Sequence, residues 1–296
     1  MNGVMVKAPG KLNLSLDILG VLPNGYHKMD MLMQTVDLFE KVIITKAKGI
    51  TVRCIGSDGT PVDGIPTDRH NTAFKAAMMF FDVADIAGGA EIAITKAVPV
   101  KAGMGGSSAD AAAVLVGLNH LYDEPLSVDK LCKIGADVGA DVPFAIVGGT
   151  CRVAGIGDVI TPVTPLDNCF IAVGMPSVGV STKDGFASFD KSGSHSHVDL
   201  DEMEKYLKNN DLTAFCAMQK NVMQPSCGTQ QTKTMCEILR ASGALSALMT
   251  GSGAAVYGIF KTLLDAQKGC EALGDLAQTT YCVTPFAKGA YVENCF

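Results

Sequence analysis

Residues 101–115, KAGMGGSSADAAAVL, place three glycines and two serines directly before an alanine-rich stretch with helical character. The first N–H groups of a helix lack partners within the helix and lie at the positive end of its dipole, so they attract anions. Glycines allow a close approach to the backbone, and Ser107 and Ser108 add hydroxyl groups. A glycine turn that only packs a helix would not need all of these features together. The stretch therefore predicts a phosphate-binding loop.

Two common phosphate-binding patterns fit the chain poorly. The Walker A loop needs Gly-Lys followed by Ser or Thr, whereas Gly10-Lys11 is followed by Leu12. The dinucleotide fingerprint needs a third glycine where Ser108 stands, and an acid that ends a second strand. Asp123 has the right distance but directly follows the predicted helix. We exclude the Walker A class, and a nicotinamide dehydrogenase remains a weak alternative.

Two other stretches carry more glycine than folding requires. APGKLNL (8–14) places Lys11 beside the first predicted strand, and MTGSGAAVYGIF (249–260) places Gly251, Ser252 and Gly253 between apolar runs. Each stretch alone is a weak signal. Together with residues 101–115 they form an ordered set of three.

Composition limits the classes of partner. The chain has 296 residues, 48% of them hydrophobic and 18% charged, which favours a well-packed protein of two domains or one large α/β unit. A net charge of -6 argues against a nucleic-acid partner, which would need a clustered basic surface. The lysines in MNGVMVKAPGKLNL argue against a signal peptide, so we expect a cytoplasmic protein. The uncharged stretch 241–260 is expected to be a buried strand-loop-strand and not a membrane span.

The ten cysteines include no C-x-x-C pair, and we expect them to be reduced and mostly buried.

The elements divide into two series. Alternating apolar residues predict a strand at 12–18, Asn24-Gly25 predicts a hairpin turn, and strands are expected near 29–38, 41–47 and 50–55. A helix capped by Asn71, a strand at 90–98 and helices near 107–122 and 127–137 follow, completing a first domain over residues 1–160. For a second domain, 161–296, we expect helices near 182–189, 199–208, 229–242 and 263–273, and strands near 169–175, 246–249, 254–260 and 279–285.

The three glycine-marked stretches resemble, in order, the three motifs of the GHMP small-molecule kinases. The central motif of that family is approximately P-x-x-x-G-L/M-G-x-S-S-A, and this chain has PVKAGMGGSSA. The resemblance implies a two-domain α+β fold, with an N-terminal half like the second domain of ribosomal protein S5 and a ferredoxin-like C-terminal half. It also implies an ATP-binding segment made of Pro99, Val100, Lys101, Ala102, Gly103, Met104, Gly105, Gly106, Ser107, Ser108 and Ala109.

Two segments outside this loop resemble the GHMP kinases that phosphorylate 4-diphosphocytidyl-2-C-methyl-D-erythritol: LPNGYHKMDMLMQTVDLFEKVII (22–44) and GADVPF (139–144). The resemblance implies that Asp141 is the catalytic base and Lys11 its cationic partner, as transfer of a phosphoryl group to a hydroxyl requires. Because Pro143 follows closely, we expect Asp141 in an extended loop. By the same resemblance the substrate-binding residues are Asn13, Tyr26, His27, Thr182 and Phe186, with the cytosine between Tyr26 and Phe186.

ATP-dependent transfer implies Mg²⁺. Its protein ligands stay unassigned, with Ser107, Ser108 and Asp110 as candidates only. Lys7, Lys11, Lys96 and Lys101 are expected to give the acidic protein a positively charged entrance to the site. Alternatives that stay open are a homoserine or mevalonate type of GHMP kinase and a nucleotide-binding module without catalysis.

Overall fold

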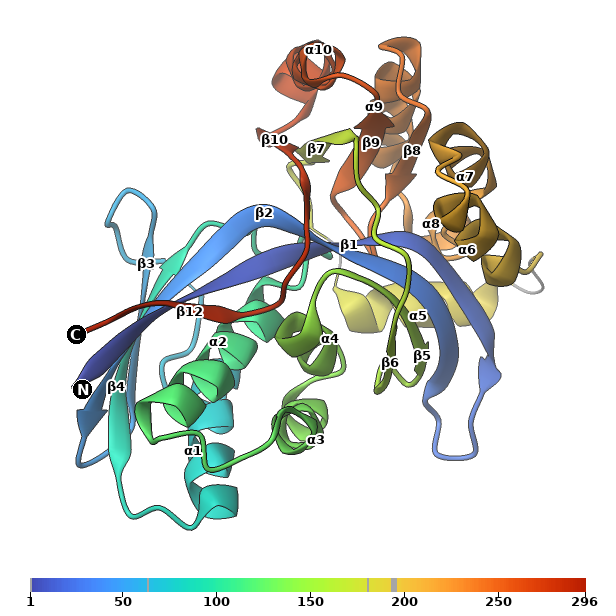
Figure 1. The fold of residues 1–296 in the computed structure, drawn as a ribbon. Helices are drawn as coiled ribbons and strands as arrows, with labels where there is room; N and C mark the ends of the chain where they lie inside the picture. The colour runs from blue at the N-terminus through green and yellow to red at the C-terminus, as the bar shows by residue number, and fades with distance from the viewer. Residues whose placement is uncertain (1, 63, 180, 193–195) are drawn as a thin grey trace.

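One very long hairpin organises the molecule. The computed structural model describes residues 2–62, 64–179, 181–192 and 196–296. In it, β1 (Gly3–Val21) and β2 (His27–Ala47) pair antiparallel along almost their whole length (Figure 1). The predicted strands 29–38 and 41–47 are thus one strand. The expected turn is present, with Gly25 at φ +84°, a conformation that favours glycine. Three shifts in register bend the hairpin so that it reaches both halves of the molecule.

The first sheet has eight strands. Its main order is β12-β1-β2-β4-β3, while β5 and β11 also pair with β2, and β6 pairs with β5. The bounds of the added strands are β3 (Thr51–Gly56), β4 (Gly89–Lys96), β5 (Thr150–Gly155), β6 (Val159–Pro162), β11 (Pro285–Phe286) and β12 (Tyr291–Cys295).

Four helices lie on one side of this sheet: α1 (Thr72–Ala84), α2 (Gly106–Leu121), α3 (Val128–Val138) and α4 (Val142–Val147) (Figure 1). Asn71 caps α1 as predicted, because its side chain accepts a bond from the Ala73 N–H. The small residues of α2 let it lie very close to the strands. A Cβ at Gly117 would come within 2.5 Å of Ile44 and 2.8 Å of Val6.

The second sheet has four antiparallel strands in the order β10-β7-β9-β8. They are β10 (Thr279–Val283), β7 (Phe170–Met175), β9 (Val256–Phe260) and β8 (Ser246–Met249), and α9 (Gln230–Ala241) and α10 (Leu263–Leu273) pack against them. The stretch 241–260 is therefore a strand-turn-strand, as expected. Within the described ranges, no helix is long and apolar enough to cross a membrane.

Four more helices lie near the bent part of the hairpin: α5 (Thr182–Lys191), α6 (Leu200–Lys208), α7 (Leu212–Met218) and α8 (Gln224–Cys227) (Figure 1). A shared core joins the two halves, in which Leu12 and Leu14 of β1 pack with Phe215 and Tyr257. The predicted α+β fold class, with two unlike halves, is confirmed.

The division at residue 160 stays a prediction, but the sheets divide differently at the C-terminus. Residues 285–295 leave the second sheet and pair with β2 and β1 in the first. Three further helices, α4, α7 and α8, were not predicted from the sequence.

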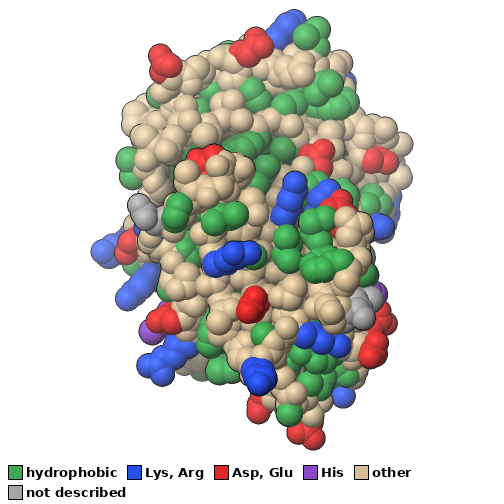
Figure 2. All heavy atoms as spheres, turned by 90° about the vertical axis from the view of Figure 1, so that its left-hand side faces the viewer, with side chains coloured by type: hydrophobic (Ala, Val, Ile, Leu, Met, Phe, Trp, Pro, Cys, Tyr) green, Lys and Arg blue, Asp and Glu red, His purple; other side chains and the backbone are tan. Residues whose placement is uncertain are grey.

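The expectation for the cysteines is met only in part. All ten cysteines are free, but only five of them are buried, three are half-buried and two are exposed. On the face shown in Figure 2, basic and acidic side chains are interspersed among apolar ones.

Candidate active site

A cavity of about 1040 Å³ opens where the hairpin, the start of α2 and the start of α5 meet. The three glycine-marked stretches all reach it, although they are far apart in sequence. Of the predicted site residues, its lining includes Lys11, Asn13, Tyr26, His27, Asp141, Thr182, Phe186, Gly251, Ser252 and the whole run 99–108. Ala109 does not line the cavity because it is fully buried within α2. Gly253 does not line it either, and a Cβ there would lie 2.8 Å from Met249 Sδ.

The glycine loop presents free backbone donors to the cavity. The first bond along α2 joins the Ala109 N–H to the Gly105 carbonyl at 2.8 Å. The N–H groups of residues 106–108 therefore have no acceptor within the helix. Gly103 and Gly105 adopt φ of +74° and +72°, and a Cβ at Gly103 would lie 2.4 Å from the Thr250 carbonyl oxygen. The positive φ at both positions favours glycine, and at Gly103 there is also no space for a side chain. The unpaired N–H groups at the start of α2 form a site suited to an anion.

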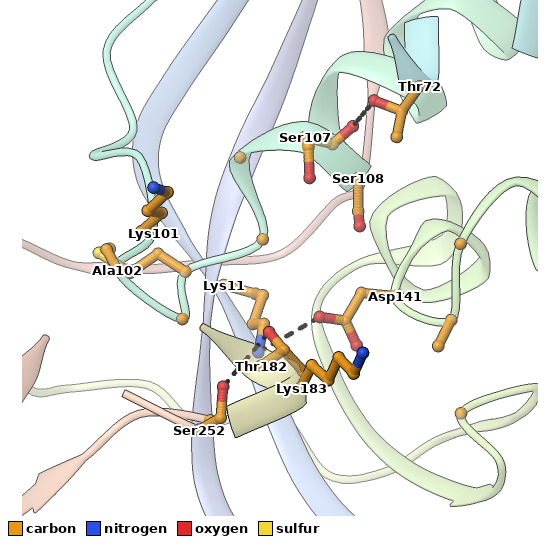
Figure 3. A pocket seen from close by; sticks show the side chains of 18 of the residues that line it. Lys11, Thr72, Lys101, Ala102, Ser107, Ser108, Asp141, Thr182, Lys183 and Ser252 are labelled. Atoms are coloured by element: carbon orange, nitrogen blue, oxygen red, sulfur yellow. Dashed lines mark hydrogen bonds and ion pairs between the residues drawn. The ribbon is translucent and has the colours of Figure 1, made fainter. Parts of the chain in front are cut away.

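Lys11 and Asp141 form an ion pair in the cavity (Figure 3). Lys11 Nζ lies 3.4 Å from Asp141 Oδ2 and donates to Asn13 Oδ1 at 2.5 Å. The Lys11 side chain is only 8% exposed, whereas that of Asp141 is 31% exposed. The Lys11 ammonium group is thus held by its bond to Asn13, and the Asp141 carboxylate remains accessible to a bound molecule.

The local backbone at Asp141 differs from the expectation. Asp141 has φ -88° and ψ -4°, which is helical and not extended, and it is the N-cap residue of α4. Pro143 is the second residue of this helix, where the N–H that proline lacks would have no partner in any case. The Asp141 side chain makes no capping bond, so its carboxylate is free to face the cavity.

The third glycine-marked stretch supports the same group of side chains. Gly251 has φ +59°, and a Cβ there would lie 3.3 Å from Asn13 Oδ1 and 3.5 Å from Lys11 Nζ. Ser252 donates to Thr182 Oγ1 at 3.4 Å, which connects this turn to the start of α5 (Figure 3). The turn therefore closes the floor of the cavity below Lys11.

The other end of the cavity is aromatic. Tyr26 is 60% exposed, and the His27 ring stacks on Phe186 with centroids 4.5 Å apart and an interplanar angle of 22°. We expected Phe186 to cover one face of a base that Tyr26 covers on the other. In this structure Phe186 is instead in contact with the His27 ring, and His27 Nε2 lies 2.7 Å from Asp190 Oδ1.

The expected positively charged entrance is only partly present. Lys7 pairs with Glu293 and does not line the cavity. Lys96 is buried and lies 2.5 Å from Glu40 Oε1 and 2.7 Å from Asp110 Oδ2, so two carboxylates oppose its charge. Burial, together with the nearby Asp110 charge, raises the pKa of Glu40 to about 7, and burial also raises the pKa of Asp110. Of these four lysines, Lys11, Lys96 and Lys101 line the cavity, and the charge of Lys96 is opposed by its two carboxylates.

Side-chain oxygens near the glycine loop are of the kind that could coordinate a magnesium ion bound together with a nucleotide. Asp110 Oδ2 accepts from Lys96 at 2.7 Å, whereas Asp110 Oδ1 has no hydrogen-bond partner among the described residues, and Asp110 lines the cavity, so it stays a candidate. Ser107 and Ser108 also line the cavity (Figure 3). Among the described residues no group of three or more His, Cys, Asp or Glu side chains could hold a metal ion. Mg²⁺ in nucleotide sites binds through few protein ligands and takes the rest from phosphates and water.

Several polar residues at the cavity could not be predicted from the sequence, among them Lys183, Asp190 and Thr72. Lys183 and Asp190 of α5 line it, and neither belongs to a recognisable motif. Thr72, the first residue of α1, also lines it and donates to the Ser107 carbonyl at 2.8 Å, which ties α1 to the glycine loop. Only the adjacency of Lys183 to the predicted Thr182 could have suggested one of them.

Fold and cavity define a class. Residues 71–149 match the N-terminal domain of GHMP kinases, and residues 197–277 match their C-terminal domain. A crystal structure of homoserine kinase from Cytophaga hutchinsonii has the same fold, with a TM-score of 0.79, 21% identity and coverage of 99% of this chain and 98% of that one. The chain is a GHMP kinase by fold and domain composition.

More similar relatives narrow the class. A 4-diphosphocytidyl-2-C-methyl-D-erythritol kinase of Clostridium perfringens is 39% identical over 272 residues, or 90% of this chain and 92% of the relative. One of Lachnoclostridium phytofermentans is 36% identical over 304 residues, or 100% and 98%. A crystal structure of 4-(cytidine 5'-diphospho)-2C-methyl-D-erythritol kinase has 25% identity and a TM-score of 0.76, covering 95% and 98%. The chain belongs to the 4-diphosphocytidyl-2-C-methyl-D-erythritol kinase family.

Proposed function

We propose that the protein transfers the γ-phosphoryl group of ATP to the 2-hydroxyl of 4-diphosphocytidyl-2-C-methyl-D-erythritol, giving the 2-phosphate and ADP. The observation that carries the proposal is the placement of Lys11 and Asp141, 3.4 Å apart, in one cavity with the glycine loop and the aromatic end. Family membership supports the choice of substrate. In this role the protein works in the cytoplasm, in the non-mevalonate route to isoprenoid precursors.

The nucleotide is assigned to the glycine loop. The free N–H groups at 106–108 and the Ser107 and Ser108 hydroxyls suit the phosphates of ATP. Mg²⁺, when bound, supplies positive charge between the phosphates and draws its protein ligands from these hydroxyls. No further protein ligand is assigned.

The acceptor hydroxyl is assigned to the space beside Asp141. The carboxylate accepts the proton that the attacking oxygen loses during transfer. Lys11 keeps a positive charge next to the carboxylate and next to the transferred group, and Asn13 holds Lys11 in place. Thr182, at the start of α5, is assigned to the same substrate-binding wall, and Tyr26, His27 and Phe186 to the cytosine end.

The test is release of ADP by the purified protein with Mg-ATP. The acceptors compared are 4-diphosphocytidyl-methylerythritol, homoserine, mevalonate and none. Turnover is expected with the cytidine compound alone, and Asp141→Asn should lower kcat by about 10²–10⁴. Turnover with another alcohol would keep the kinase but discard the assignment of the aromatic end. No turnover with any acceptor would favour a nucleotide-binding module without catalysis.

A further inference from the structure

The His27 ring is held on two sides by one helix. Its Nε2 atom lies 2.7 Å from Asp190 Oδ1, and its face stacks on Phe186 at 4.5 Å between centroids. Phe186 and Asp190 are separated by one turn of α5, so both lie on the same side of that helix. Phe189 also meets the ring, edge-on at 6.4 Å. The His27 side chain is only 12% exposed, and its position is fixed by these contacts.

The contact with Asp190 also determines which ring nitrogen carries a proton. A carboxylate only accepts hydrogen bonds, so Nε2 must donate to it. In a neutral imidazole with the proton on Nε2, the other nitrogen, Nδ1, is an acceptor. Within the described part of the chain, Nδ1 makes no hydrogen bond. The ring therefore carries an acceptor nitrogen, and His27 lines the aromatic end of the cavity.

We infer that Asp190 is a positioning residue for base recognition: by holding His27 in the Nε2–H form, it makes the site select a cytosine over a uracil. This inference rests on the proposed function, because it assigns the cytosine to this end of the cavity. Asp190 lines the cavity but is itself 51% exposed, so it acts through the ring. Its role is to set the direction of one hydrogen bond.

Discrimination follows from the chemistry of the two bases. Cytosine carries an exocyclic amino group, which donates to an acceptor such as Nδ1, and uracil carries a carbonyl oxygen at the same position. If uracil bound in the same way, its carbonyl oxygen would face His27 Nδ1. Both atoms are acceptors, so no hydrogen bond could form between them. A polar group left unpaired in this way lowers affinity strongly, which is how a hydrogen-bonding site rejects a close analogue.

The first measurement is the protonation of His27 in the intact protein, by ¹⁵N NMR of the histidine ring nitrogens, with His27→Gln used to assign the signals. We expect Nε2 to carry the proton and Nδ1 to be bare. Asp190→Asn should give a mixture of the two forms, because the amide can either accept from or donate to the ring. Protonation of Nδ1 in the unaltered protein, alone or with Nε2, would overturn the inference.

The second measurement is binding of CDP and UDP by calorimetry, which needs no catalysis. The unaltered protein should prefer CDP by about tenfold or more, equivalent to at least about 1.4 kcal/mol. Asp190→Asn and Asp190→Ala should bring the preference down to about threefold or less. The matched control is Asp184→Asn, which removes an exposed acid from the same helix outside the cavity lining and should keep the preference.

Steady-state kinetics then distinguishes a loss of base recognition from a general loss of enzyme activity in the Asp190 variant. If 4-diphosphocytidyl-methylerythritol is turned over, Asp190→Asn should raise its KM by about tenfold and change kcat by about threefold or less, since one hydrogen bond to the base is lost and Asp141 is untouched. A CDP preference that persists in Asp190→Asn, or its absence in the unaltered protein, would overturn the inference. If instead the NMR and binding results are as expected but no ADP is released, the proposed function fails and the role of Asp190 stands.

Discussion

Lys11 Nζ lies 3.4 Å from Asp141 Oδ2, while Asn13 Oδ1 lies 2.5 Å from the same nitrogen. The bonds come from separate parts of the chain, β1 and the N-terminus of α4. A buried ammonium thus pairs with a carboxylate that is still accessible to a bound molecule. This relationship distinguishes Lys11 from the other lysines of the chain, most of which are paired on the surface or exposed.

Lys11→Met keeps the length of the side chain and removes its charge. We expect kcat with 4-diphosphocytidyl-methylerythritol to fall by about 10²–10³, the usual loss when one charge-stabilising donor is removed. The check is steady-state ADP release beside Lys41→Met, which removes an exposed lysine of β2 outside the cavity lining. A Lys11→Met enzyme as fast as the control would show that the cation has no part in the reaction.

Gly103→Ala tests the close packing of the phosphate loop. The added Cβ would meet the Thr250 carbonyl oxygen at 2.4 Å, in addition to the strain of φ +74°. We expect a lower midpoint of thermal unfolding and a KM for ATP raised by about tenfold, because the loop must move away from the third glycine-marked stretch.

The matched control is Gly243→Ala. Gly243 also has a positive φ, +94°, but a Cβ there would meet nothing within 4 Å. It therefore shows the cost of the backbone conformation alone, which is about 1 kcal/mol. If both variants lower the unfolding midpoint equally and bind ATP equally well, the close approach of Gly103 to Thr250 contributes neither to stability nor to ATP binding.

Local signals explain what the sequence predicted well. Asn71 ahead of an apolar helical pattern marked the start of α1, and Asn24-Gly25 marked the hairpin. The glycine loop was predicted because its chemistry is contained in one stretch of chain. The helical start at Asp141 was missed because the bias of Pro143 toward extended structure, which acts on Val142, was extended to Asp141, and because proline is also tolerated in the first turn of a helix.

Long-range contacts explain what was missed. The return of β12 to pair with β1 joins the two ends of the chain, and no local pattern marks such a pairing. Asp190 was missed for the same reason, since its importance comes from His27, 163 positions away. Lys96 lines the cavity as predicted, but its sequence neighbours did not show that Glu40 and Asp110 would pair with its charge.

Lys96→Met tests the buried group formed by Lys96, Glu40 and Asp110. Loss of the ammonium leaves two buried carboxylates without their cation. Breaking a buried pair in this way costs about 3–5 kcal/mol. The measurement is the free energy of unfolding from urea titration, beside Lys205→Met, which removes an exposed lysine paired with Glu202 and should cost about 1 kcal/mol or less. Equal losses in the two variants would contradict a structural role for the buried group.

Glu40→Gln tests the raised pKa in the same group. Burial and the charge of Asp110 raise the pKa of Glu40 from 4.5 to about 7 in the folded protein. Between these values the folded protein binds a proton that the unfolded chain has released, so the contribution of Glu40 to stability is present at low pH and is lost as pH rises toward about 7. The size of that loss is about 3 kcal/mol, at 1.36 kcal/mol for each pKa unit.

Glutamine cannot titrate, so the unfolding free energy of the Glu40→Gln protein should depend less steeply on pH across this window. The difference between the unaltered protein and the variant should shift in favour of the variant from about pH 5 to about pH 7 and then level off, because Glu40 is then ionised in both folded and unfolded protein. Urea titrations at about one-unit intervals of pH measure it. A difference that stays constant across the window would mean that Glu40 titrates as an ordinary carboxyl despite its burial, and that Lys96 fully compensates both acids.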